Sequence, residues 1–234
     1  MTMTQRVALV TGTGGELGAA IAAALAASGA MVVGLDIADT ATDLTARHYR
    51  CDLSDLAAVG EVLDSIRREV GPIEVLVNNA AYYRHTPFFE LTPEQIRTTL
   101  AVNVTAVLFL CQQVARQIIQ SGSGGVIVNV ASIAGRNGSS QVDYGASKAA
   151  VINLTATLGR VLAEHGIRIN GVAPALVGSG MGTRLGPGVR EKFLAATPLK
   201  RAAEPAEVAD VVAFLASDAA SYLNGTTIDI HGGL

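Results

Sequence analysis

Short apolar runs that alternate with longer helical segments constrain this chain more than any other feature. The runs include residues 6–11 (RVALVT), 73–78 (IEVLVN) and 125–131 (GVIVNVA). Their apolar residues are continuous rather than alternating, as in strands that are buried on both faces of a sheet. Strands separated by helices pair in parallel through right-handed crossovers. The pattern predicts an α/β fold with a Rossmann-like, doubly wound parallel sheet and helices on both faces.

Seven strands are expected in a single domain that spans residues 1–234, because no linker and no repeat divides the chain. The other four strands are expected at residues 30–36, 47–51, 167–172 and 226–230. Helices are expected at residues 17–28, from Ser54 onward, from Pro93 onward, at 101–120, at 144–164, at 189–196 and at 205–217. Proline at the first helical position supports the starts at Pro93 and Pro205.

The composition limits the classes of protein to which the chain can belong. Half of the residues are hydrophobic and 16% are charged, which excludes intrinsic disorder. The net charge of −3 argues against nucleic acid or an anionic membrane as a partner. No transmembrane helix is expected, since no continuous apolar run is long enough. Two cysteines cannot build a disulfide framework, and the histidines lack metal-ligand spacing, so we expect a cytoplasmic protein without a metal site.

A glycine-rich turn follows the first expected strand and leads into an alanine-rich helix. It reads TGTGGELG over residues 11–18. Such a turn lets backbone N–H groups approach a pyrophosphate, and the helix N-terminus adds positive potential. A tight turn without a ligand is the alternative, but strand, turn and helix in this order favour a dinucleotide site. Its expected contacts are Gly12, Gly14, Gly15, Glu16, Leu17 and Gly18.

Asp36 ends the second expected strand, where a carboxylate can accept hydrogen bonds from both hydroxyls of the adenosine ribose. It would repel a 2′-phosphate, and no arginine or lysine follows closely. We therefore expect NAD(H) rather than NADP(H) as the cofactor. Asp52, at the end of the third strand, is a candidate adenine contact; capping of the helix near Ser54 is the alternative.

The motifs that follow are similar to those of one known family. The chain resembles the short-chain dehydrogenases/reductases over essentially its full length. Its glycine turn matches the family pattern TGxxxGxG except at Glu16, and residues 78–81 (NNAA) resemble the family's NNAG. The resemblance implies that Asn103 (in AVNV), Ser132 (in NVASIAG), and Tyr144 and Lys148 (in YGASK) are catalytic. It also implies cofactor contacts at Leu53, Asn79, Ala80, Tyr144, Lys148, Pro174, Val177 and Ser179.

The spacing of Tyr144 and Lys148 places both side chains on one face of a helix. A phenol loses its proton near pH 10. A neighbouring ammonium and an oxidised nicotinamide both stabilise phenolate, so we expect a lowered pKa for Tyr144. The tyrosine would then exchange a proton with an alcohol or ketone oxygen, which Ser132 would polarise. By resemblance, Asn103 supports a backbone–water link that relays protons to Lys148, and Lys148 binds the nicotinamide ribose.

Glu16 stands where the family pattern has glycine. Beside a pyrophosphate its charge repels, by roughly 2–3 kcal/mol at about 6 Å and an effective dielectric constant near 20. If it points to solvent, screening removes most of this effect. If the position requires a positive φ, glutamate also adds backbone strain.

The residues that follow NNAA are Tyr82, Tyr83, Arg84 and His85, and we expect them to flank the substrate. Residues Arg84, His85 and Arg136 are candidate oxyanion ligands, although solvated surface side chains are the stronger interpretation. The expected substrate pocket contains Tyr82, Arg84, Arg136, Val142 and Met181. The glycine-rich segment 177–197 is expected to form a flexible flap over it.

The preferred hypothesis is an NAD(H)-dependent oxidoreductase that interconverts a secondary alcohol and a ketone. A 3-oxoacyl-acyl-carrier reductase is an alternative, against which Asp36 and the acidic pI near 5.8 both count. A dinucleotide sensor without turnover is a third hypothesis, and Glu16 is its only support. The partner is expected to be a small molecule, and the apolar helices 101–120 and 144–164 make a homo-oligomer, a dimer or a tetramer, plausible.

Overall fold

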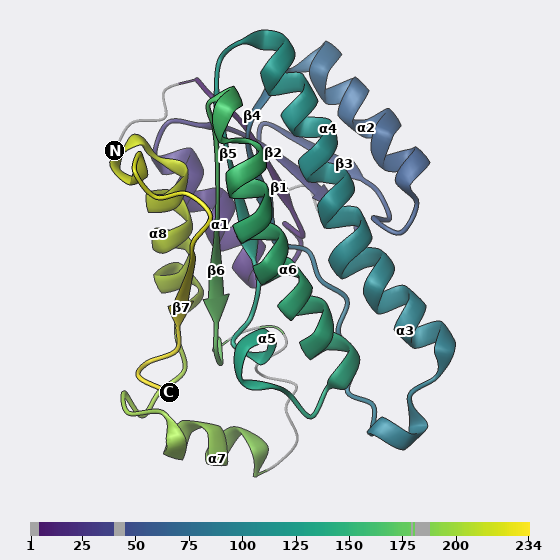
Figure 1. Ribbon diagram of the computed structural model, residues 1–234, viewed down its shortest axis with the longest axis vertical. Helices are drawn as coiled ribbons and strands as arrows, with labels where there is room; N and C mark the ends of the chain where they lie inside the picture. Colours follow the sequence, from purple (N-terminus) through teal and green to yellow (C-terminus); the bar gives the residue numbers. More distant parts are fainter. Residues whose placement is uncertain (1–4, 40–44, 179, 181–187) are drawn as a thin grey trace.

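The computed structural model describes residues 5–39, 45–178, 180 and 188–234. Within them lies one parallel sheet with the strand order β3-β2-β1-β4-β5-β6-β7 (Figure 1). Its strands are β1 (Val7–Thr11), β2 (Met31–Asp36), β3 (Arg47–Arg50), β4 (Ile73–Asn78), β5 (Gly125–Val130), β6 (Ile167–Pro174) and β7 (Thr227–Ile230). The predicted doubly wound, seven-stranded sheet is confirmed.

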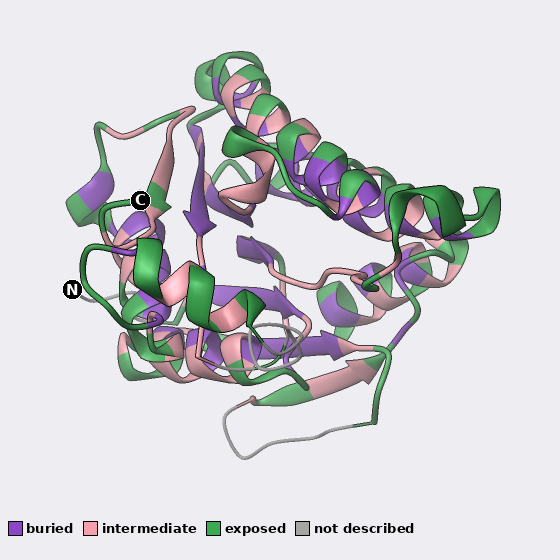
Figure 2. Cartoon of the chain, turned by 90° about the horizontal axis from the view of Figure 1, so that it is seen from below, coloured by how far each residue is buried: buried purple, intermediate pink, exposed green. Residues whose placement is uncertain are grey.

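Helices cover both faces of this sheet, and the buried core lies in two layers between helices and strands (Figure 2). One layer joins the sheet to α1 (Glu16–Ala27) and α8 (Pro205–Ala216). The other joins it to α2 (Leu56–Glu69), α4 (Ala106–Ser121) and the end of α6 (Val142–Val161). Successive residues of β1 enter opposite layers, and both are shielded from water, which is why the strands read as continuous apolar runs.

Side-chain caps explain where several helices begin. The Asp55 carboxylate accepts hydrogen bonds from the N–H groups of Ala57 and Ala58, both at 3.1 Å, so α2 begins at Leu56. The predicted start at Ser54 is therefore two residues early. Thr92 caps α3 (Pro93–Leu100) by accepting from the N–H of Gln95 at 3.2 Å. Proline is the first residue of both α3 and α8, as predicted.

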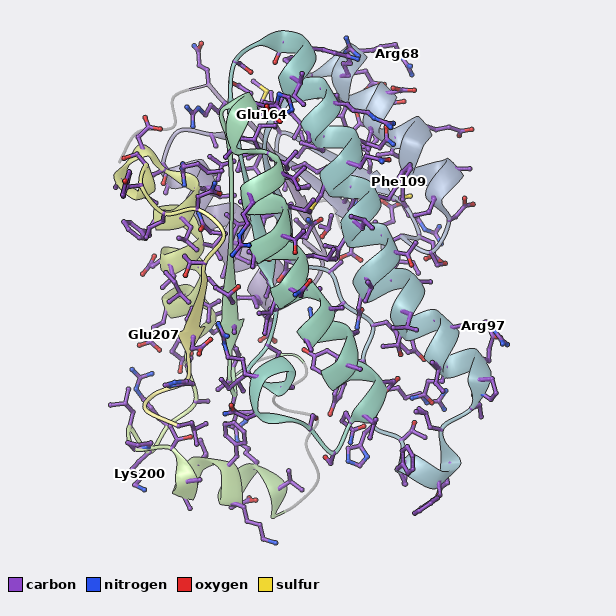
Figure 3. The ribbon with its side chains drawn as sticks, in the orientation of Figure 1. Arg68, Arg97, Phe109, Glu164, Lys200 and Glu207 are labelled. Carbon is purple, nitrogen blue, oxygen red and sulfur yellow. The ribbon has the colours of Figure 1, made fainter. Side chains whose placement is uncertain are left out.

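The helix expected at residues 101–120 is interrupted. A π-helical turn, Ala101–Thr105, lies between α3 and α4, and the three elements form a continuous helical stretch, Pro93–Ser121. By length and composition alone this stretch is long and apolar enough to cross a membrane, a test that the core helix of a globular protein also passes. Its residues Leu110, Val114 and Ile118 are buried in the core against the sheet, and Phe109 packs against the same core (Figure 3).

The carboxyl ends of the strands lie at the lower end of the molecule in Figure 1, beside α5 (Ala134–Asn137) and α7 (Val189–Ala196). From β1 the chain winds outward through β2 and β3, whereas β4 starts the other half of the sheet on the opposite side of β1. Ligands of open α/β sheets bind outside the carboxyl ends at such a switch point. Short 3₁₀ turns at Phe88–Glu90, Ala163–His165 and Asp218–Ala220 complete the described elements.

Candidate active site

A cavity of about 730 Å³ opens at the carboxyl ends of the strands. It extends from the glycine-rich turn at β1 to Val189 and Phe193 of α7. The predicted cofactor contacts that line it are Gly12, Gly15, Glu16, Leu17, Gly18, Asp36, Asp52, Leu53, Asn79, Ala80, Tyr144, Lys148, Pro174 and Val177. Gly14 does not line this cavity, and Ser179 lies outside the described residues.

The glycine-rich turn is built so tightly that side chains would not fit at two positions. Gly12 has φ +76°, and a Cβ added there would lie 2.9 Å from the Ala80 Cα. A Cβ at Gly18 would lie 2.0 Å from the carbonyl oxygen of Gly12. Glu16, by contrast, is the exposed first residue of α1 and has helical geometry, so glutamate there causes no backbone strain. The strain considered for this residue is therefore ruled out.

Asp36 is tied to the glycine-rich turn by a direct contact. Its carboxylate accepts hydrogen bonds from the N–H of Gly14 at 2.8 Å and of Ala38 at 2.9 Å. Gly14 therefore contacts Asp36 and is not part of the cavity wall. Asp52 lines the cavity, and its Oδ1 accepts from the N–H and hydroxyl of Ser54, both at 2.8 Å. It stabilises the turn before α2, while Asp55 caps that helix.

The NNAA segment after β4 is fastened to the end of β1. The Thr11 hydroxyl accepts hydrogen bonds from the N–H groups of Asn79 and Ala80, both at 3.0 Å. The Asn79 side-chain amide donates to the Thr11 carbonyl oxygen at 2.9 Å. These contacts hold the two loops as one wall of the cavity at the switch point of the sheet.

Three of the four predicted catalytic residues line the cavity together: Ser132 after β5, and Tyr144 and Lys148 on α6. The Lys148 ammonium lies 5.7 Å from the centre of the Tyr144 ring and donates a hydrogen bond to the Val130 carbonyl oxygen at 2.7 Å. Lys148 is only 3% exposed, so its ammonium is not a solvated surface charge.

Asn103 is fully buried behind the wall of this cavity, in the π-helical turn before α4. Its side-chain oxygen accepts from the N–H of Tyr82 at 2.7 Å, and its amide donates to the Tyr82 carbonyl oxygen at 2.9 Å. The same amide donates to the hydroxyl of Ser147 on α6 at 3.0 Å. Asn103 therefore connects the loop after β4 to the helix that carries Tyr144 and Lys148.

Burial sets the protonation of the two titratable groups on α6. It raises the pKa of Tyr144 to about 12, against a smaller opposing effect of a hydrogen bond with Ser132. It lowers the pKa of Lys148 to about 8. In the protein without a cofactor, burial disfavours the phenolate more than the Ser132 hydrogen bond favours it. The lowered pKa expected beside a bound oxidised nicotinamide stays a prediction.

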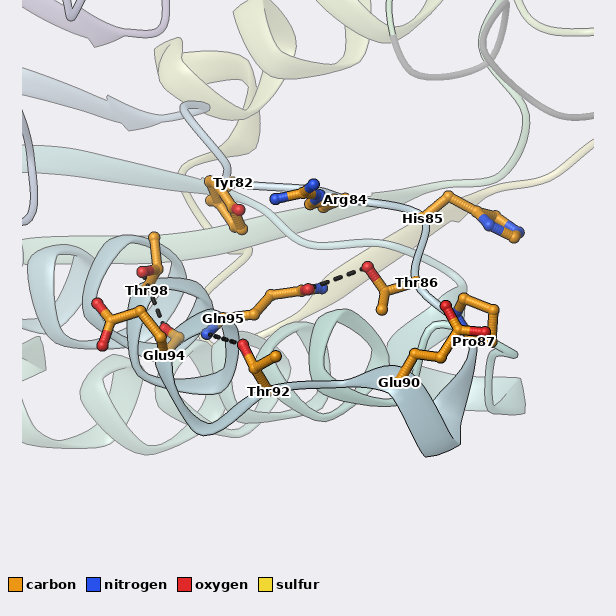
Figure 4. A pocket seen from close by; sticks show the side chains of 10 residues that line it. All are labelled: Tyr82, Arg84, His85, Thr86, Pro87, Glu90, Thr92, Glu94, Gln95 and Thr98. Atoms are coloured by element: carbon orange, nitrogen blue, oxygen red, sulfur yellow. Dashed lines mark hydrogen bonds between the residues drawn. The ribbon is translucent and has the colours of Figure 1, made fainter.

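The predicted substrate residues do not all reach the cavity. Arg84 lines an adjoining cavity of about 410 Å³ between the loop after β4 and α3 (Figure 4), and Tyr82 and His85 line both cavities. Arg136 instead forms an ion pair with Asp229 of β7 at 2.6 Å and donates to the Thr227 carbonyl oxygen at 2.9 Å. Val142 is 46% exposed and does not line the cavity, and Met181 lies outside the described residues.

Tyr83 and His85, which were expected to flank the substrate, line the cavity, and so do Val189 and Phe193 from the segment predicted as a flap. Gln141 lines it as well, whereas Ser139 is a cavity residue that the sequence did not indicate. The tyrosine pair at residues 82–83 was a visible signal, but the sequence does not reveal which of the two rings meets Tyr144. The segment predicted as a flap carries α7 in its second half, while most of its glycine-rich first half lies outside the described residues.

Comparisons with known proteins agree with this geometry. Residues 14–234 match a protein-family model described as "Enoyl-(Acyl carrier protein) reductase". D-threitol dehydrogenase of Mycolicibacterium smegmatis is 37% identical over 97% of this chain and 92% of its own. 3-Oxoacyl-[acyl-carrier-protein] reductase of Thermotoga maritima is 35% identical over 100% of this chain and 99% of its own.

A solved structure of NAD⁺-bound xylitol dehydrogenase superposes with a TM-score of 0.91. It is 31% identical, and the match covers 100% of both chains. The match to the family model and the full-length likeness to these enzymes show that the chain belongs to the short-chain dehydrogenase/reductase family of oxidoreductases.

Proposed function

We propose that this protein is an NAD(H)-dependent oxidoreductase that interconverts a secondary alcohol and a ketone. One observation carries the proposal. A single cavity has the glycine-rich turn and Asp36 at one end, and Ser132, Tyr144 and Lys148 along its wall. The first group suits a dinucleotide, and the second suits proton exchange at a substrate oxygen.

The described residues fit a bound dinucleotide. Glycine at positions 12 and 18 allows the tight turn of a dinucleotide site, because a Cβ there would clash with the backbone of Ala80 or with the Gly12 carbonyl oxygen. The first N–H groups of α1 have no acceptor within the helix and lie at the cavity. When bound, a nicotinamide dinucleotide supplies the carbon that accepts or donates hydride.

The protein's own residues handle the substrate oxygen and its proton. With its pKa raised to about 12, Tyr144 is protonated at neutral pH and is ready to donate its proton to a ketone oxygen. The Ser132 hydroxyl can donate to the same oxygen and stabilise its developing charge. In the oxidative direction the Lys148 ammonium near the ring favours the phenolate that accepts the alcohol proton.

Asp36 supports NAD(H) as the preferred cofactor. Its carboxylate is held in place by two backbone N–H groups at the cavity wall. A ribose hydroxyl can donate to it, whereas a 2′-phosphate would meet a like charge. The next residue is Ile37, which offers no compensating cation.

The likeness to a 3-oxoacyl-[acyl-carrier-protein] reductase keeps an acyl-carrier substrate as the second candidate. Against it, Lys148 is the only lysine or arginine among the described residues that line the cavity. A cavity wall with one cation offers few ion pairs to an acidic carrier protein or to its phosphate group.

Purified protein with NAD and a panel of secondary alcohols tests the proposal through NADH absorbance. Tyr144→Phe should reduce turnover to near background while NAD still binds in a titration. Tyr222→Phe is the matched control, since Tyr222 is fully exposed and outside the cavity. Unchanged turnover in Tyr144→Phe would refute the mechanism. NAD binding without turnover on any alcohol or ketone would favour the sensor hypothesis instead.

A further inference from the structure

A second phenol stands beside the catalytic one. Tyr83, on the loop after β4, lines the same cavity as Tyr144. The two rings meet edge to face, with centres 5.1 Å apart and planes at 86°. Tyr83 is half-buried, and within the described part of the chain its hydroxyl has no hydrogen-bond partner. The mechanism above assigns this group no task.

The loop that carries Tyr83 is anchored on both sides of it. Before it, the backbone N–H and carbonyl of Tyr82 are both bound by the buried side chain of Asn103. After it, the Thr86 N–H donates to Gln141 Oε1 at 3.2 Å, and the Thr86 hydroxyl donates to Gln95 Oε1 at 2.9 Å (Figure 4). A polar group held in place in this way binds a ligand with little loss of its own conformational entropy.

Several uncharged polar groups line the same cavity as Tyr144, within a wall that is mostly apolar. Gln141 is only 5% exposed and lines the cavity; its amide oxygen binds Thr86, while its NH₂ group has no partner among the described residues. His85 and Ser139 add further hydrogen-bonding groups to the same wall. Burial and the charge of Asp143 raise the pKa of Tyr83, so its hydroxyl keeps its proton at neutral pH and can both donate and accept.

We propose that Tyr83 is a substrate-binding residue that hydrogen-bonds a second hydroxyl, on the carbon next to the reacting one, of a neutral polyhydroxylated substrate. The inference rests on the proposed function, since Tyr144 must engage the reacting oxygen. Two phenol groups on rings in edge contact can reach oxygens on neighbouring carbons of one small molecule. Gln141 is positioned in the same wall to bind a further hydroxyl of a longer polyol.

Two alcohols that differ by one hydroxyl test this role: 2,3-butanediol and 2-butanol. Tyr83→Phe keeps the ring contact with Tyr144 and removes only the hydroxyl. Its kcat/KM for the diol should fall about tenfold, the upper range expected for one neutral hydrogen bond. Its kcat/KM for 2-butanol should stay within about twofold of the wild-type value. Tyr222→Phe should change neither value.

A binding measurement separates recognition from chemistry. In the Tyr144→Phe background, where turnover is lost, the NAD-loaded protein should bind the diol about tenfold more weakly when Tyr83→Phe is added. Equal loss for both alcohols, or an undiminished preference for the diol, would overturn the inference while leaving the proposed function intact. Turnover of both alcohols that survives Tyr144→Phe would instead refute the proposed function, and the inference with it.

Discussion

Replacing Lys148 with methionine is expected to stabilise the protein at neutral pH while abolishing turnover. The side chain is 3% exposed, and burial lowers its pKa from 10.5 to about 8. Each tenfold shift in a protonation equilibrium is worth about 1.4 kcal/mol, so holding the ammonium inside costs the folded state about 3 kcal/mol at pH 7. Methionine has a similar length and carries no charge.

The lost hydrogen bond opposes this gain. Lys148 donates to the Val130 carbonyl oxygen at 2.7 Å, and an unpaired buried carbonyl costs about 1–3 kcal/mol. The net stabilisation is therefore about 0–2 kcal/mol, which raises Tm by up to about 6 °C in a chain of this length. A substitution that stabilises the protein while it abolishes turnover is expected at a residue that is retained for function and not for stability.

The pH dependence gives the prediction a second signature. Because the folded pKa of about 8 lies below the unfolded value of 10.5, the folded wild type binds fewer protons than the unfolded chain between these pH values. The cost of burying the Lys148 ammonium in the folded wild type is thus fully present below pH 8, and it disappears as the pH rises through the unfolded pKa. Near pH 10.5 only the lost hydrogen bond remains, so the wild type becomes the more stable protein.

Urea unfolding at several values from pH 7 to pH 10.5, without NAD in the buffer, measures the difference. Lys192→Met, at an exposed lysine of α7, is the control and should show no such pH dependence. A Lys148→Met protein that is less stable than the wild type at pH 7 would refute the reasoning. A stability difference that does not change with pH would refute it as well.

Two further predictions concern the cofactor end of the cavity. Glu16→Gly should tighten NAD binding several-fold at low salt, because an exposed charge at the cavity is removed, and the gain should shrink as salt screens it; a titration that gives equal or weaker affinity would contradict this. Asp36→Ala should raise the ratio of kcat/KM with NADP to that with NAD by about tenfold. The substitution removes the repulsion between the carboxylate and the 2′-phosphate of NADP, which is worth roughly 1–2 kcal/mol. Asp39→Ala, at an exposed neighbour, is its control, and an unchanged ratio would show that Asp36 does not select the cofactor.

The sequence was sufficient for the sheet because its signals are local. Continuous apolar strands, the proline starts of α3 and α8, and the glycine turn all act over a few residues, and the structure confirms each of them. The placement of Ser132, Tyr144 and Lys148 along one cavity also follows from motif order and helical spacing.

The points that the sequence did not predict depend on contacts between residues that lie far apart in the chain. Arg136 was expected at the substrate, but Asp229, which lies 93 residues away in the chain, holds it at the edge strand. The pKa of Tyr144 depends on how completely the surrounding loops exclude water, which spacing on a helix does not report. Tyr82 and Tyr83 are neighbours with the same chemistry, and it is the loop, anchored at Tyr82 and at Thr86, that places the Tyr83 ring against Tyr144.

The double anchoring of the loop after β4 has a practical consequence for protein engineering. Asn103 binds both the Tyr82 backbone and the hydroxyl of Ser147 on α6, so one buried amide connects residue 82 to the helix that carries Tyr144 and Lys148. Thr86 is bound in the same way at the other end of the loop. Libraries that seek new selectivity should randomise residues 83–85 and leave both anchor positions as they are.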